Sequence, residues 1–158
     1  MKKNVVLTVL LSLIILSLSS CSSTKVLPAN VSNNAKNLNL SKDKAIVYVF
    51  RTSALGFAVG LNVDCNNSQL ASFYPKKFYV SVLDPGKYVF TGRAENESDL
   101  IVNLEANKKY YIEAIPQMGF GSARIKLKQI DQIDGNSKVQ KCKLIGLNDE
   151  AKELLNYE

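Results

Sequence analysis

The chain has 158 residues, of which 20 are Lys or Arg, 14 are Asp or Glu and none is His, so its formal net charge is +6 at pH 7. The positive charges are spread along the chain rather than clustered, which argues against a nucleic-acid-binding protein. The lack of histidine removes the commonest general base, the usual zinc ligand and every Ser–His or Cys–His nucleophile pair. We therefore expect a protein that is not an enzyme and that needs no cofactor and no metal.

The first 20 residues have the order of a secretory signal peptide. Lys2 and Lys3 precede an apolar run over residues 5–18, and Ser19 and Ser20 follow it. As a helix the run is roughly 21 Å long, shorter than the ~30 Å hydrocarbon core of a bilayer, so an uncleaved transmembrane anchor is the weaker alternative. Residues 1–20 are predicted to be a signal peptide.

Residues 18–21, Leu-Ser-Ser-Cys, match the bacterial lipobox. The resemblance implies that Cys21 receives a diacylglycerol thioether, that the chain is cut before it, and that the new amino end is acylated, for example with palmitate. Two or more acyl chains hold a protein on a membrane stably. Residues 21–43 are rich in Ser and Asn, which disfavour helix and strand, so they are predicted to be the lipidated cysteine and a flexible tether.

Residues 44–158 are predicted to form one all-β domain, a β-sandwich with a short C-terminal helix. Short runs rich in β-branched and aromatic residues alternate with turns that contain Asn, Pro and Gly. The helix is expected over residues 148–156, with Asn148 as its N-cap and Asp149 and Glu150 at its positive end. The expected strands cover residues 45–51, 57–64, 69–74, 78–83, 87–93, 99–104, 109–115 and 123–130.

Cys65 and Cys142 remain once Cys21 is assigned to lipid. An even pair of cysteines in an exported chain predicts a disulfide, because the compartment is oxidising. Buried free thiols are the alternative, since sequence does not show whether the two Cα atoms come within ~7 Å.

The order of several motifs resembles a known family. Residues 46–51 contain Tyr-x-Phe-Arg, Val-Asp follows at residues 63–64, Asp-Pro-Gly at residues 84–86, and an acidic turn leads to a Lys-x-Tyr-Tyr-like strand over residues 104–112. This order resembles the bacterial lipoprotein domain-of-unknown-function family 2846, over about residues 44–130. The resemblance implies a small β-sandwich akin to the peptidase-regulatory and transthyretin-like modules, and it implies no activity. Cys65 stands where this family commonly has Gly, and residues 75–77 depart from its pattern.

The candidate contact surface is a stretch of rings and cations around one loop. Aromatic and cationic side chains together suit recognition of a protein or a glycan, although alternate rings of a sandwich strand must face the core. The residues of this stretch are Phe73, Tyr74, Lys76, Lys77 and Tyr79.

The charged residues offer weaker candidates. Arg51 ends an apolar strand and should be paired, with Asp84 or Glu113 as the expected partners. The acids at positions 95, 97 and 99 fit an exposed loop better than a calcium site, and Asp134-Gly135-Asn136 fits a turn. A hydrolase would need Asp64, Asp84 or Glu113 to converge in one cleft.

These features predict a lipid-anchored β-sandwich of the cell envelope that acts as a non-enzymatic binding or structural module. Its expected partners are the membrane, through the acyl chains on Cys21, and an envelope protein or glycan. A small-ligand or glycan-binding lipoprotein is the alternative. Ser22 after the lipidated cysteine resembles the outer-membrane sorting signal of enteric bacteria, which implies the periplasmic face of the outer membrane.

Overall fold

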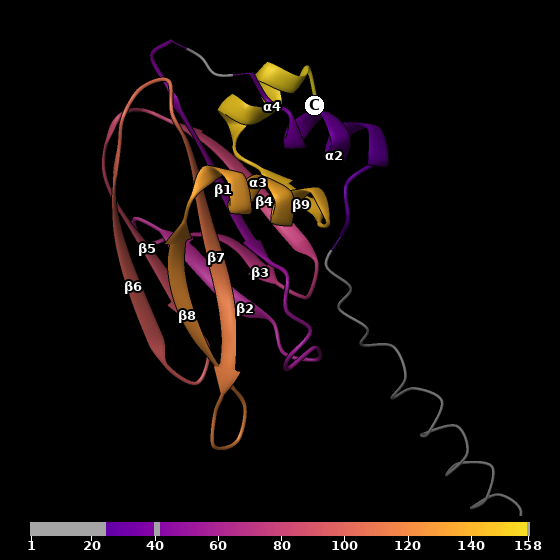
Figure 1. Cartoon of the computed structure of the whole chain (residues 1–158), viewed down its shortest axis with the longest axis vertical. Coiled ribbons are helices and arrows are strands. Elements are labelled where there is room, and N and C mark those ends of the chain that lie inside the picture. Colours follow the sequence, from indigo (N-terminus) through magenta and orange to yellow (C-terminus); the bar gives the residue numbers. More distant parts are fainter. Residues whose placement is uncertain (1–24, 40–41, 158) are drawn as a thin grey trace, which may run out of the picture.

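The structure, a computed structural model, describes residues 25–39 and 42–157. The predicted signal peptide and Cys21 lie outside these residues. Within the described part, no helix is both long and apolar enough to cross a bilayer. The fold prediction is confirmed: two β-sheets pack face to face, and a short helix ends the chain (Figure 1).

One sheet has the strand order β8-β7-β1-β4-β9 and the other the order β3-β2-β5-β6. The strands of the first sheet are β1 (Ala45–Arg51), β4 (Lys77–Leu83), β7 (Lys109–Met118), β8 (Ala123–Ile130) and β9 (Lys143–Leu147). The strands of the second sheet are β2 (Leu61–Cys65), β3 (Ser68–Phe73), β5 (Gly86–Arg93) and β6 (Glu97–Leu104). The three helices, α2 (Ala29–Lys36), α3 (Gln132–Gln140) and α4 (Asp149–Leu155), lie against the outer face of the five-stranded sheet (Figure 1).

The core has two layers, one on each face of the five-stranded sheet. Val47, Val49 and Ile112 face the second sheet, whereas Ile46, Tyr48 and Phe50 face the helices. Strand β1 lies in the middle of its sheet and is buried along its whole length, which explains why its sequence is an unbroken apolar run before Arg51.

Side chains join the two sheets along one side of the sandwich. The amide group of Asn96 both donates to the carbonyl of Ile125 (3.0 Å) and accepts from its N–H (2.7 Å). The hydroxyl of Ser98 accepts from the N–H of Leu127 at 3.0 Å. The outer edge of β8 therefore does not offer these polar groups to another strand.

The prediction of a flexible tether up to residue 43 is wrong for α2. Val31, Ala35 and Leu38 are buried against the five-stranded sheet, and the N–H of Leu27 donates to the carbonyl of Leu144 on β9 (2.9 Å). These contacts supply the burial that the composition of the segment did not suggest. The part of the predicted tether that precedes Lys25 lies outside the described residues.

The predicted disulfide is not formed, since Cys65 and Cys142 are both free and buried. Cys65 lies in the layer between the two sheets, whereas Cys142 lies in the layer under the helices, so the five-stranded sheet separates them. Burial in apolar surroundings raises the pKa of each thiol to about 11.

We expect both thiols to resist alkylation in the native protein at neutral pH, because burial excludes the reagent and the raised pKa keeps them protonated. The measurement is mass-spectrometric counting of alkylated cysteines in a Cys21→Ser chain, before and after unfolding in urea without reductant. A Ser122→Cys variant, which adds a thiol at an exposed position, is the control that should react at once. A Cys65–Cys142 crosslink in the mass spectrum would contradict the structure.

Candidate functional site

The candidate site is the end of the sandwich at which β1 and β7 finish. These two strands are parallel neighbours, so the loop after β1 (residues 52–60) and the loop after β7 (residues 119–122) lie at the same end, which we call the loop end. In Figure 1 the β7–β8 loop points downward, away from α2 and α4. Residues 52–60 and 114–123 contain no charged side chain.

Four apolar side chains at the loop end are exposed to solvent. Leu55 and Phe57 on the β1–β2 loop are 45% and 73% exposed, and Met118 and Phe120 on the β7–β8 hairpin are 81% and 106% exposed. We call these four residues the apolar tip. Exposed apolar side chains gathered on two neighbouring loops indicate an interaction surface more strongly than single scattered ones.

The two loops of the tip touch each other. A Cβ placed on Gly56, whose φ is +61°, would lie 3.1 Å from the Cβ of Ala123, the first residue of β8. A shallow groove of about 360 Å³ runs between the loops, and Leu55, Val59, Met118 and Phe120 are among the residues that line it.

Arg51 shapes the β1–β2 loop from inside. Its side chain is fully buried, and its five N–H donors bond to five backbone carbonyls at distances between 2.6 Å and 3.2 Å. The carbonyls belong to Ser53, Leu55, Gly56, Val59 and Phe73. The guanidinium therefore holds the loop in one shape and fixes it to the end of β3.

The prediction that Arg51 pairs with Asp84 or Glu113 is wrong. Asp84 forms an ion pair with Lys44 (2.8 Å) at the opposite end of β1, and Glu113 bonds to other groups. Carbonyl groups that turn inward in a loop need donors as much as a carboxylate does, and a single arginine supplies five. The composition of residues 52–60 gives no sign of this arrangement, because backbone carbonyls belong to every residue.

Glu95 holds the β7–β8 loop in shape, as Arg51 holds the β1–β2 loop. Its carboxylate accepts hydrogen bonds from the N–H groups of Phe120 and Ser122, each at 3.1 Å. These backbone donors, followed by the nearby charge of Arg124, lower the pKa of Glu95. A side chain at Gly119 would overlap with the backbone carbonyl of Ser122 as well as with the Glu95 carboxylate, so glycine is required where the loop closes.

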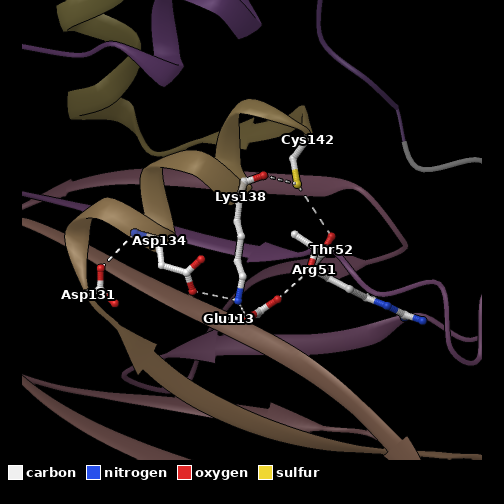
Figure 2. A network of polar contacts seen from close by, with 7 residues as sticks. All are labelled: Arg51, Thr52, Glu113, Asp131, Asp134, Lys138 and Cys142. Carbon is white, nitrogen blue, oxygen red and sulfur yellow. Dashed lines mark hydrogen bonds and ion pairs between the residues drawn. The ribbon is translucent and has the colours of Figure 1, made fainter.

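A second polar network lies nearby, under α3, and is shown in Figure 2. The carboxylate of Glu113 accepts from the Thr52 hydroxyl (2.6 Å) and pairs with the Lys138 ammonium (2.8 Å). The hydrogen bond from Lys138 to Glu113 raises the lysine pKa, so this amine stays protonated. The Cys142 thiol donates to the carbonyl of Lys138 at 3.5 Å, and its own raised pKa keeps it neutral. Each group is engaged in fixing α3 to the sheet.

The residues of the predicted contact surface are dispersed by the fold. Phe73 is fully buried between the sheets, and the ring of Tyr79 packs against Gly146 on β9. Tyr74 and Lys77 are half-buried, and Lys76 is exposed on the β3–β4 turn, which also lies at the loop end. The alternation of core-facing rings, rather than recognition of a ligand, explains most of this stretch.

The acids do not converge. Asp64 forms an ion pair with Arg93 on the outer face of the four-stranded sheet, far in the fold from Asp84 and Glu113. Glu97 also pairs with Arg93 (2.8 Å), and Asp99 accepts from Thr91 (2.7 Å). Among residues 25–39 and 42–157, no three acids and cysteines gather as a set of metal ligands.

The apolar tip was missed by reasoning from sequence. The signal that was present is the pair of uncharged segments, residues 52–60 and 114–123, in a chain of which 22% is charged. Residues 57–60 were predicted to begin a strand and residues 119–121 to form a turn, and nothing in the sequence shows that the two segments meet.

No protein-family model matches the chain. An uncharacterized protein of Haemophilus influenzae is 23% identical to it over 129 residues, which cover 80% of this chain and 77% of that protein. The similarity extends over most of both chains and attaches no activity to either.

Proposed function

We propose that this protein is a lipid-anchored module of the bacterial cell envelope that works by binding through the loop end of its β-sandwich. The anchor is the acylated Cys21, and the protein lies on the periplasmic face of the outer membrane. Membership of the lipoprotein family named above is part of this proposal.

The observation that carries the binding role is the apolar tip. Exposing Phe57, Met118 and Phe120 to water costs free energy, and burial of the same side chains against a partner recovers it. Both loops are held in shape before any partner arrives, one by Arg51 and the other by Glu95. A preformed loop loses less conformational entropy on binding than a mobile one, which favours a binding role.

The charged groups near the tip support binding rather than catalysis. Arg51 donates all its N–H groups to carbonyls, Glu95 accepts from backbone amides, and Glu113 is held between Thr52 and Lys138. None of these side chains is directed toward the groove as a free acid, base or nucleophile.

The anchor is tested by the substitution Cys21→Ala. We expect the parent protein, expressed in a bacterium and fed a labelled fatty acid, to carry the label and to show the mass of an acylated chain that begins at Cys21. Cys21→Ala should carry no label, because the thioether needs the thiol of that residue. Cys65→Ala, which removes a buried thiol, is the matched control and should be labelled like the parent. Equal labelling of Cys21→Ala and the parent would refute the anchor.

A further inference from the structure

We propose that the apolar tip inserts into the interface of the same membrane that carries the anchor, so that the domain is held to the lipid surface at two points. This inference rests on the proposed acylation of Cys21. It names the partner of the loop end as an anionic lipid surface.

The shape of the tip suits a lipid interface. Phe57 on the β1–β2 loop and Met118 and Phe120 on the β7–β8 hairpin are 73% to 106% exposed, so these side chains project into solvent beside the shallow groove. Lipid chains move apart around projecting side chains, whereas a protein partner would need a matching hollow. Residues 52–60 and 114–123 carry no charge of their own, and the carboxylate that lies closest to Phe120, that of Glu95, is bonded to backbone N–H groups of the loop.

In both loops, several backbone N–H and C=O groups already have hydrogen-bond partners within the protein and do not need water. Polar backbone groups that lose water without a new partner carry a high energetic cost in lipid. Arg51 already binds the carbonyls of Leu55 and Gly56, and Glu95 already binds the N–H groups of Phe120 and Ser122. Shallow insertion of the tip leaves these bonds intact.

Three exposed cationic side chains lie along β8, next to the apolar tip. Arg124, Lys126 and Lys128 alternate with core residues along β8 and are all exposed. At about 3.3 Å per residue they lie roughly 3, 10 and 17 Å from the start of the strand, whereas one headgroup layer is about 5–8 Å thick, so Arg124 and Lys126 lie nearest to the headgroups and Lys128 lies behind them. In the described part of the chain Lys126 and Lys128 form no ion pair, so both are available to lipid phosphates, each contributing about 1 kcal/mol near an anionic surface.

The length of chain before Leu27 permits both contacts at once. Leu27 bonds to Leu144, which lies level with Phe78, Phe50 and Glu113 across the sheet. Met118 is five residues further along β7, about 17 Å closer to the tip. Cys21 is six residues before Leu27 and has a maximum reach of about 20 Å. When fully extended, this segment brings Cys21 level with Met118 along the sheet, so its acyl chains can enter the lipid surface that the tip faces.

The chain has no tryptophan, which allows a direct test of insertion. Phe120→Trp places a fluorophore in the tip, and Ile133→Trp places one at an 86% exposed apolar position on α3 as the matched control. Both variants are prepared as full acylated protein, and also as an unacylated chain that begins at residue 22. Both core layers are formed by residues from 27 onward, so the shorter chain keeps the whole fold. The vesicles contain phosphatidylethanolamine and phosphatidylglycerol, with and without a brominated lipid that quenches tryptophan.

We expect brominated vesicles to reduce the fluorescence of Phe120→Trp about twofold and to leave Ile133→Trp unchanged, because only the tip enters the layer that holds the bromine. The unacylated chain should bind the same vesicles, and Phe57→Ser and Phe120→Ser should each weaken that binding about tenfold. Lys126→Gln with Lys128→Gln should reduce its dependence on salt.

Equal quenching of Phe120→Trp and Ile133→Trp would overturn the inference. So would an unacylated chain that does not bind vesicles, even if Cys21 proves to be acylated. In that case a crosslink from the tip to an envelope protein would assign the surface to a protein partner. If the protein proves to carry no acyl group but the chain that begins at residue 22 binds vesicles, insertion of the tip is supported, whereas the anchor and the two-point attachment are refuted.

Discussion

Replacing Arg51 by methionine is expected to destabilise the protein by about 4 kcal/mol. The substitution removes five hydrogen bonds and leaves the carbonyls of the β1–β2 loop without donors in a buried place. The loss exceeds that of an ordinary surface charge, because each buried carbonyl that stays unpaired costs roughly 1–3 kcal/mol and only some of them can turn to water. Urea unfolding of Arg51→Met and the parent gives this difference.

Arg93→Met is the matched control for this prediction. Arg93 also lies at the end of a strand, but its side chain is 45% exposed; of its two partners, Glu97 is 66% exposed and Asp64 is only 9% exposed. Loss of the exposed pair costs about 1 kcal/mol or less, and the Asp64 carboxylate left without its arginine brings the expected loss to no more than about 2 kcal/mol, half of that expected for Arg51→Met. Amide exchange separates the two effects further, since Arg51→Met should speed exchange within residues 52–60 while Arg93→Met should not. Equal losses of stability in the two variants would refute the role of Arg51 as the organiser of the loop.

The strands were predictable where local pattern and tertiary position agree. The apolar run of Ala45–Arg51 matches a strand that is covered on both faces, and the alternation in Ala123–Ile130 matches an edge strand with one wet face. The turn before Ser68 was also predictable, because Asn66 and Asn67 adopt φ values of 47° and 66°, which asparagine tolerates. The C-terminal helix begins where expected, with the Asn148 side chain accepting from the N–H of Ala151.

The missed elements are those whose stability comes from distant residues. Strand β9 is short, and it is recognisable only from its parallel pairing with β4. Helix α2 contains three asparagines in eight residues, a poor helix composition, yet it is held by the burial of Val31 and Ala35. The Tyr48 hydroxyl also donates to the carbonyl of Ala35 at 3.0 Å, a bond across 13 residues that no local pattern reports.

The apolar tip was not predicted either, because it too depends on contacts between segments that are distant in the sequence. Phe57 was predicted to begin a strand and Phe120 to lie in a tight turn, while Leu55 and Met118 fell in no predicted element. Their common position at the loop end follows from the parallel pairing of β1 with β7, which the order of strands in the sequence does not reveal. The two uncharged segments can be seen separately in the sequence, but the proposed binding surface exists only because the fold brings them together.

Helix α3 was interpreted as a turn because of Asp134-Gly135-Asn136. The presence of glycine at position 135 is explained by packing against the sheet. The N-cap of the helix is Asp131, whose carboxylate accepts from the N–H of Asp134 at 2.9 Å. Gly135 faces the sheet, and a Cβ there would overlap with the ring of Tyr111. That ring is itself stacked on Tyr48, with centroids 5.1 Å apart, so it has little freedom to move aside.

Gly135→Ala is therefore expected to destabilise the protein by about 2 kcal/mol, although the same change inside an exposed helix stabilises by about 1 kcal/mol. Asn136→Ala, at the next and exposed position of α3, is the matched control and should change stability by less than about 0.5 kcal/mol. In a Tyr111→Leu background the cost of Gly135→Ala should shrink, because leucine lacks the ring atoms that meet the new methyl group. Urea unfolding of the four chains in this cycle measures the coupling. A Gly135→Ala protein more stable than its parent would show that α3 does not lie this close to Tyr111, and the anchoring of α3 through Lys138 and Glu113 would then need the same revision.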